Sequence, residues 1–160
     1  MRTVSAVLVL AFCLFAWDAP AQPGKNKTCE LNVADVMAFG RYDPMDASAL
    51  DVQGRVSYRC GKKLAGDRDQ IHVLISLSGG QAGTFQRYMT GGRDKLRYNL
   101  YLDPTRTQIW GDGTGGTQVY SAKAQPNNKV TVVPVFGRVF GGQDVAAAVY
   151  LDHIVVTLDF

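Results

Sequence analysis

The sequence predicts an all-β fold, an antiparallel β-sandwich that ends on a strand. Three observations carry this prediction. Apolar residues recur at every second position through most of the chain, clusters of Gly, Pro, Asn and Asp separate the alternating segments, and hardly any window has helical spacing. Six or seven short strands between such turns, without a repeat of fixed period, are typical of a sandwich of immunoglobulin-like type.

Residues 1–21 are predicted to be a signal peptide. Met1-Arg2 gives a positive start, Val4 to Trp17 is apolar, and Ala19-Pro20-Ala21 supplies the small-x-small pattern of a cleavage site. The alternative is an N-terminal membrane anchor, but the apolar run is shorter than the about 20 residues that such a helix needs. We expect Cys13 to be removed with this segment, which leaves residues 22–160 as a single domain.

The charge of the chain argues against a nucleic-acid partner. There are 17 Lys and Arg residues against 14 Asp and Glu, a formal net charge of +3. The basic residues are scattered and only Lys62-Lys63 are adjacent, so the sequence has no continuous positive stripe. Since no apolar run in 22–160 has membrane-spanning length, we also expect no membrane span in the mature chain.

The first two predicted strands carry the remaining cysteines. One apolar face is made by Cys29, Leu31 and Val33, and the next by Val52, Val56, Tyr58 and Cys60. In an exported chain an even number of cysteines predicts a disulfide, here Cys29–Cys60, lying in the core between the two strands. Closing a loop of about thirty residues contributes about 3 to 4 kcal/mol. The alternative is a pair of free buried thiols.

Three further strands follow before the last one. They are expected over Ile71 to Leu77, Leu96 to Tyr101 and Lys129 to Phe140. Pro134 and Gly137 interrupt the third of these. Because proline has no N–H for the ladder, that strand is expected to lie at an edge, or to be bulged, at this point.

The last predicted strand, Val149 to Phe160, alternates up to its end. Its apolar face carries Tyr150, Ile154, Val156, Leu158 and Phe160, and its polar face His153, Thr157 and Asp159. No later hairpin partner follows this strand. One of its edges is therefore either covered by an earlier segment or open to another polypeptide.

No set of residues predicts a catalytic site, a metal or a cofactor. The loop Gly111 to Gly116 lacks the flanking strand, helix and lysine of a phosphate-binding loop, so it is predicted to be a hairpin or crossover loop. Asp103 and Asp112 lack the acidic spacing of a calcium loop, and His72 and His153 are too few for zinc. There is no Gly-x-Ser-x-Gly motif either, and we expect no enzymatic activity.

Several short motifs run in order through the chain. They are Cys29; Phe39-Gly40 with Tyr42-Asp43-Pro44; Gly54 to Cys60; Arg87 and Met89; Leu96 with Tyr98-Asn99-Leu100-Tyr101; Trp110-Gly111-Asp112-Gly113-Thr114; Gly137-Arg138-Val139 with Gly142-Gln143; Tyr150 with Asp152; and Val156-Thr157. Each motif is short, but the ordered set is specific and covers Cys29 to Phe160. In these motifs the chain resembles the spore coat protein U domain family, which includes the pilins of archaic, Csu-type chaperone-usher pili.

The resemblance implies an exported, structural or adhesive subunit whose immunoglobulin-like fold lacks its final strand. In such pilins a periplasmic chaperone lends a strand to the open groove, and a neighbouring subunit later replaces it, which is donor-strand complementation. The implied partners are a periplasmic pilus chaperone, an outer-membrane usher and neighbouring subunits, and the implied location is a fimbrium or coat at the cell surface. The groove is expected beside Leu31, Val33, Ile154, Val156, Leu158 and Phe160.

One segment departs from the family pattern. A polymerising pilin needs an alternating apolar donor segment at its mature N-terminus, whereas Gln22 to Thr28 is short and polar. We therefore expect a subunit that accepts a strand without giving one, either at the end of a fibre or in a coat that does not polymerise.

The alternative function is a small outer-membrane β-barrel, suggested by export, β-rich sequence and the final Phe160. Barrel strands span about 9 to 11 residues and present an apolar band to lipid. Several predicted strands here are shorter, and an inward disulfide has no role in such a wall.

Overall fold

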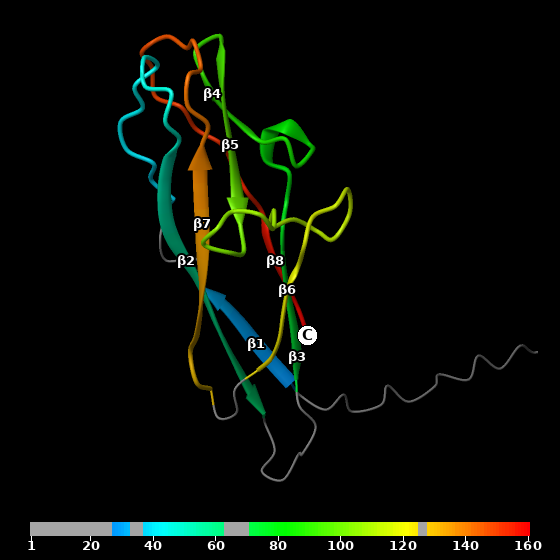
Figure 1. Ribbon diagram of the computed structural model, residues 1–160. Helices are drawn as coiled ribbons and strands as arrows, with labels where there is room; N and C mark the ends of the chain where they lie inside the picture. Colours follow the sequence, from blue (N-terminus) through cyan, green and yellow to red (C-terminus); the bar gives the residue numbers. More distant parts are fainter. Residues whose placement is uncertain (1–26, 33–36, 63–70, 125–127) are drawn as a thin grey trace, which may run out of the picture.

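The computed structural model describes residues 27–32, 37–62, 71–124 and 128–160 (Figure 1). Over these residues the chain forms eight β-strands and one short 3-10 helix. They are β1 (Lys27–Asn32), β2 (Leu50–Lys62), β3 (His72–Leu77), η1 (Gly80–Ala82), β4 (Tyr88–Gly91), β5 (Asp94–Tyr101), β6 (Tyr120–Lys123), β7 (Thr131–Val139) and β8 (Val156–Asp159). The predicted signal peptide and Val33 lie outside the described residues. Within the described residues, no helix reaches the length and hydrophobicity needed to cross a membrane.

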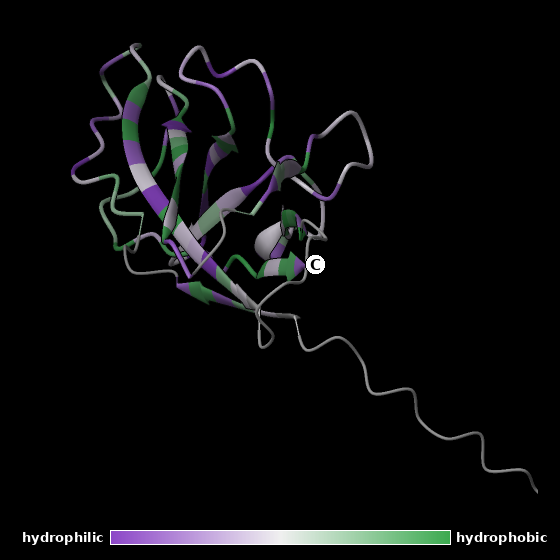
Figure 2. Cartoon of the chain, turned by 90° about the horizontal axis from the view of Figure 1, so that it is seen from below, coloured by the Kyte–Doolittle hydropathy of each residue, from purple (hydrophilic) through white to green (hydrophobic). Residues whose placement is uncertain are grey.

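The strands form two antiparallel sheets that share one core. The larger sheet has the order β1-β2-β7-β5-β4 and the smaller one the order β6-β3-β8. Side chains from both sheets, such as Val56, Val135 and Ile75, join one buried cluster. Figure 2 shows hydrophobic and hydrophilic residues following one another along the long strands. The predicted all-β antiparallel sandwich is confirmed.

The paired strands β2 and β7 form the centre of the larger sheet. Their register runs from Leu50 opposite Val139 to Tyr58 opposite Thr131. Pro134 was expected to lie where the strand is at an edge or bulged, and the strand does have an edge at this position although it is central elsewhere. β7 is a central strand, but β5 pairs with it only from Phe136 to Val139, so at Pro134 β2 alone lies beside it. The missing N–H of the proline therefore leaves the ladder between β7 and β5 intact.

Two four-residue strands, β4 and β6, were not predicted, because so few residues give hardly any periodicity to detect. The loop that contains Gly111 to Gly116 leads from β5 in the larger sheet to β6 in the smaller one, so of the two predicted alternatives, hairpin or crossover, the loop is a crossover. Trp110, directly before the glycine-rich part of this loop, is fully buried, and its Nε1 donates to the carbonyl of Ile75 at 2.8 Å. This hydrogen bond fixes the crossover to the central strand of the smaller sheet.

The predicted terminal strand, Val149 to Phe160, is wrong in its extent, because β8 covers only Val156–Asp159. Leu151 instead exchanges two backbone hydrogen bonds of 2.8 and 3.0 Å with Thr90 of β4, in the other sheet. The segment thus crosses from one sheet to the other before it joins β3. Inward and outward side chains alternate over 154–159 as expected, but Phe160 is 57% exposed and does not join the core.

Candidate functional site

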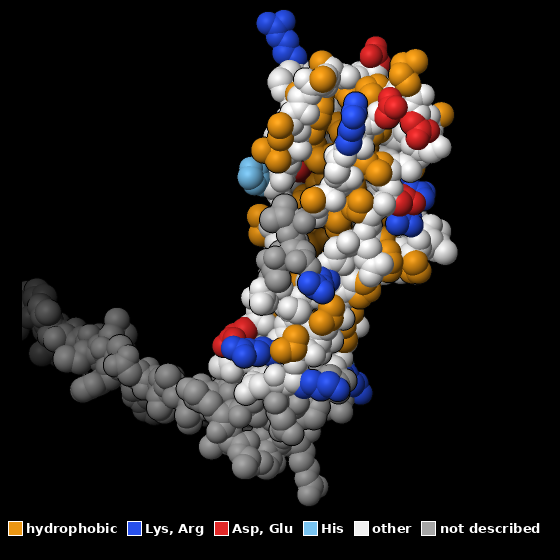
Figure 3. Space-filling model, turned by 90° about the vertical axis from the view of Figure 1, so that its left-hand side faces the viewer, with side chains coloured by type: hydrophobic (Ala, Val, Ile, Leu, Met, Phe, Trp, Pro, Cys, Tyr) orange, Lys and Arg blue, Asp and Glu red, His pale blue; other side chains and the backbone are white. Residues whose placement is uncertain are grey.

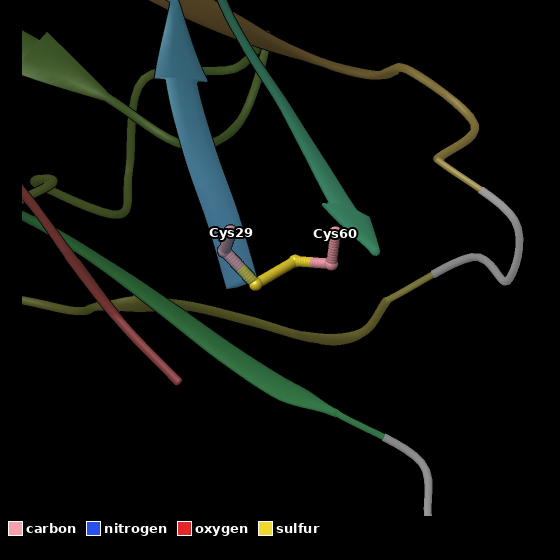
Figure 4. Close-up of a disulfide and its surroundings, with 2 residues drawn as sticks. All are labelled: Cys29 and Cys60. Carbon is pink, nitrogen blue, oxygen red and sulfur yellow. A yellow bond between two sulfur atoms is a disulfide. The ribbon is translucent and has the colours of Figure 1, made fainter. Parts of the chain in front are cut away.

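The end strand β1 of the larger sheet is held by the predicted disulfide, which is confirmed (Figure 4). Cys29 and Cys60 lie directly opposite each other, with 4.1 Å between their Cα atoms. The carbonyl of Cys60 accepts from the amide of Asn128, away from β1, so the cysteines form a non-hydrogen-bonded pair. By the alternation of the ladder, Cys29 and Leu31 direct their own N–H and C=O groups away from β2, toward the outer side of this end strand, while their side chains pack against the core.

The end strand β8 of the smaller sheet also directs the backbone groups of its core-facing residues outward. Ser78 donates its amide to the carbonyl of Val155 at 2.9 Å, which makes these two residues a hydrogen-bonded pair. Hydrogen-bonded pairs alternate in an antiparallel ladder, so Val156 and Leu158 direct their backbone groups away from β3. Within the described residues, no backbone partner meets them on that side. The side chains of Val156 and Leu158 also pack against the core.

An apolar groove opens between the segments 37–42 and 150–156. Its inner part is a cavity of about 250 Å³ with a floor from both sheets, including Val56, Val135 and Leu77. A neighbouring cavity of about 640 Å³ shares Met37 and Tyr150 with it. Figure 3 shows hydrophobic side chains inside a hollow on one face of the molecule.

The first wall of the groove is the segment 37–42. Along it Met37, Phe39 and Tyr42 are half-buried. Two glycines on the inner face of the larger sheet make room for this wall. A Cβ at Gly54 would lie 3.0 Å from the Met37 methyl, and one at Gly137 would lie 2.8 Å from the Phe39 ring. Residues 37–42 form no backbone hydrogen bond to any other described residue.

The second wall is the segment 150–156. Leu151 is bonded to β4 and Val155 to Ser78, so the backbone is fixed from behind. Ile154 and Val156 turn their side chains into the cavity and are half-buried there. The groove is therefore bounded by apolar side chains on a fixed wall, next to a strand whose outer edge meets no backbone partner among the described residues.

The predicted groove residues fall into three groups. Ile154 and Val156 line the cavity. Leu31 and Leu158 pack against the core on the two end strands, β1 and β8. Phe160 is mostly exposed, and Val33 lies outside the described residues.

Several lining residues were not predicted to belong to a groove, namely Met37, Phe39, Tyr98 and Leu151. A signal existed in the sequence, since Gly54 and Gly137 interrupt two apolar faces where a larger side chain is expected. A missing side chain on each of two strands indicates that another segment packs there.

The other candidate residues have structural roles. His72 and His153 are exposed, as their place on the polar faces predicts. Asp103 accepts from the amides of Thr107 and Gln108, and Asp112 accepts from Thr114, whose hydroxyl and amide lower the pKa of that carboxyl. Both aspartates thus cap turns. Across the described residues, no three His, Cys, Asp or Glu side chains gather as a metal site would require.

The fold has a counterpart among solved structures. It is similar to a chain in the crystal structure of the CsuC–CsuE chaperone–tip adhesion subunit pre-assembly complex, from the archaic chaperone-usher Csu pili of Acinetobacter baumannii. The TM-score is 0.56 and the sequence identity 19%, over 84% of this chain. The similar region is 40% of that chain, so the likeness shows a shared fold over less than half of its length.

The sequence itself also has relatives. The family model of the Spore Coat Protein U domain matches residues 19–157. Protein U of Myxococcus xanthus is 32% identical over 129 residues, which cover 76% of this chain and 70% of that protein. The chain therefore belongs to the spore coat protein U domain family.

Proposed function

We propose that this protein is an exported structural subunit of a coat or chaperone-usher pilus, whose sandwich is completed by a β-strand from another polypeptide. One observation carries the proposal: an apolar groove runs beside a sheet edge that is unpaired within the described residues. Exposed apolar side chains and unpaired backbone groups of a sheet edge both promote non-specific association with other chains, so such a groove needs to be covered.

An incoming strand would satisfy both kinds of group. Its backbone would pair with the N–H and C=O groups of Val156 and Leu158, and its alternate side chains would enter the cavity above Val56 and Val135. Backbone pairing gives affinity in such complexes, and the side chains in the groove give specificity. This is the pattern of strand addition to an exposed sheet edge.

The proposed partners are a periplasmic pilus chaperone, an outer-membrane usher and neighbouring subunits. The family and the fold shared with a chain of a chaperone–subunit complex support this assignment. Export requires the signal peptide proposed for residues 1–21, and it brings the mature chain, residues 22–160, to the cell surface in a fimbrium or coat. A role in adhesion or biofilm is part of the same proposal.

We further propose that this subunit accepts a strand but does not donate one. If cleavage follows Ala21, the candidate donor at the mature N-terminus is Gln22 to Thr28, which is short and polar. Its last two residues, Lys27 and Thr28, are already paired with Lys62 and Gly61 in β1. A segment held in its own sheet is not free to enter a neighbour.

Co-expression with a candidate periplasmic chaperone tests the proposal. The expected result is a soluble complex of one chaperone and one subunit by native mass measurement, with poor recovery of the subunit alone. N-terminal sequencing of the recovered subunit places the cleavage site and so tests the donor segment. A closed, monomeric subunit that binds neither the chaperone nor an alternating apolar peptide would contradict the proposal.

A further inference from the structure

We infer that Tyr98 and Asp152 set the width of the groove and are positioning residues for the strand that enters it. The inference depends on the proposed function, since it concerns the same groove. It starts from one contrast: the cavity is lined mostly by apolar side chains, yet a phenol and a carboxylate are bonded to each other on its lining.

Tyr98 contacts both walls of the groove. It lies on β5 in the floor and is only 3% exposed. Its ring packs edge-on against Phe39 of the first wall, with 5.6 Å between the ring centroids. Its hydroxyl donates to Oδ2 of Asp152, in the second wall, at 2.7 Å. One rigid side chain therefore spans the distance between two segments that belong to different ends of the sequence.

Asp152 is in turn held on its other side. Its Oδ1 accepts from the amide of Gln81 at 2.8 Å, and the Gln81 side chain donates to the carbonyl of Leu151 at 3.0 Å. Gly80 has φ of +64°, and a Cβ there would overlap the Asp152 carboxylate. Because glycine has no Cβ and readily adopts this left-handed conformation, the Asp152 carboxylate can lie directly against the backbone at this position.

A buried guanidinium completes this support. Arg87 is 1% exposed and donates to the carbonyls of Ser78 and Trp110 and to the Asn99 side chain. Ser78 then exchanges hydrogen bonds with Val155 through its amide and its hydroxyl. The second wall is consequently held by polar contacts from behind, which leaves Ile154 free to turn into the cavity.

The protonation state of Tyr98 suits this role. Burial of the phenol and its hydrogen bond to Asp152 raise the pKa of Tyr98 well above its ordinary value. The hydroxyl therefore remains a donor at any physiological pH. A groove whose walls are already at the right separation spares the incoming strand the cost of ordering them, and such pre-organisation raises affinity.

The test compares Tyr98→Phe with a matched control, Tyr101→Phe. Tyr98→Phe keeps the ring against Phe39 and removes only the bond to the second wall. Tyr101 lies on the same strand, β5, and is 6% exposed, but it is not among the residues that line either cavity. Asp152→Ala serves as a second variant, because it removes the acceptor at the other end of the same hydrogen bond.

The probe is a synthetic peptide that alternates Val or Ile with Thr, bound to the full mature chain. Tyr98→Phe is expected to weaken binding about 10- to 100-fold, the range for loss of a hydrogen bond to a charged group. Tyr101→Phe is expected to change it less than about threefold. In the free subunit, Tyr98→Phe is also expected to speed amide hydrogen exchange at Ile154 and Val156, and the double variant with Asp152→Ala is expected to lose little more binding than the more affected single variant.

The outcomes separate the two proposals. If the wild-type chain binds neither peptide nor chaperone, the proposed function is wrong. If the wild type binds and Tyr98→Phe binds equally, with unchanged exchange at Ile154, the positioning role is wrong and the function stands. Should Tyr98→Phe fail to fold, Asp152→Ala decides: normal binding and exchange in that variant would overturn the role of the pair.

Discussion

Val156→Asp is the sharpest perturbation of the groove, because its neighbour supplies the control. Val156 lies on the inward face of β8 and lines the cavity, and its backbone groups point away from β3, toward the edge that has no partner within the described residues. Val155, one residue earlier, points outward and is 65% exposed. The same change of side chain at these two adjacent positions therefore meets opposite surroundings.

The expected loss follows from what each side chain contacts. Complete burial of a valine by an incoming strand is worth about 1.5 to 3 kcal/mol. An aspartate at Val156 loses this term and adds the cost of a carboxylate against apolar floor residues, which is several kcal/mol for an unpaired charge. The sum exceeds about 3 kcal/mol, or about a hundredfold in Kd. Val155→Asp is a surface change, expected to cost within about 0.5 kcal/mol.

The assay is the dissociation constant for an alternating apolar peptide or for the chaperone, measured on the mature chain. Export to the periplasm and far-UV circular dichroism are followed in parallel and are expected to be alike for the two variants. Val156→Thr, which keeps the shape and adds a hydroxyl, is expected to fall between wild type and Val156→Asp.

Two results would refute the reasoning. If Val155→Asp weakened binding as much as Val156→Asp, general charge rather than the groove would govern capture. If Val156→Asp bound within about threefold of wild type, the strand would dock elsewhere.

Three other predictions concern the framework of the groove. Cys29→Ser and Cys60→Ser should each lower the free energy of unfolding by about 3 to 4 kcal/mol, and the double variant by little more, in urea titrations; additive losses would mean that the thiols act separately. Gly137→Ala should cost about 1 to 3 kcal/mol because its Cβ meets the rigid Phe39 ring, whereas Gly54→Ala, facing the flexible Met37 side chain, should cost less; equal costs would contradict the proposed packing. The hydrogen bond from Arg138 lowers the pKa of Asp51 below 3.8, the value of a free aspartate. The ion pair therefore stabilises the fold fully above pH 3.8, and its contribution is lost as the pH falls through the lowered pKa of Asp51. Asp51→Asn should therefore reduce the melting temperature at pH 7 and much less near pH 2, and a constant difference would show that the ion pair does not titrate with folding.

Most strands of the fold were predictable because each carries its own pattern. β2, β3, β5 and β7 alternate apolar and polar residues, and the observed strands differ from the predicted ones by no more than a few residues at their ends. The disulfide followed from the number of cysteines and from their place on apolar faces. These are properties of a segment and its own side chains.

The groove was only partly predictable, because its walls depend on partners far away in the sequence. The alternation of Val149 to Phe160 indicated which side chains face inward, but not that Leu151 pairs with Thr90 in the other sheet. The same pattern could not place Phe39 on Gly137 or the Tyr98 hydroxyl on Asp152. The alternation of apolar and polar residues specifies on which face of a sheet a side chain lies, but it does not specify which side chain of another segment will contact it.

The sequence alone determined the β class of this protein, the faces of its main strands, its disulfide and the resemblance to its family. Tertiary structure decided where the terminal segment leaves one sheet for the other and which side chains enclose the cavity. The physical reason is that side-chain alternation arises within a strand, whereas pairing and cavities arise from hydrogen bonds and contacts between segments that the chain brings together only on folding.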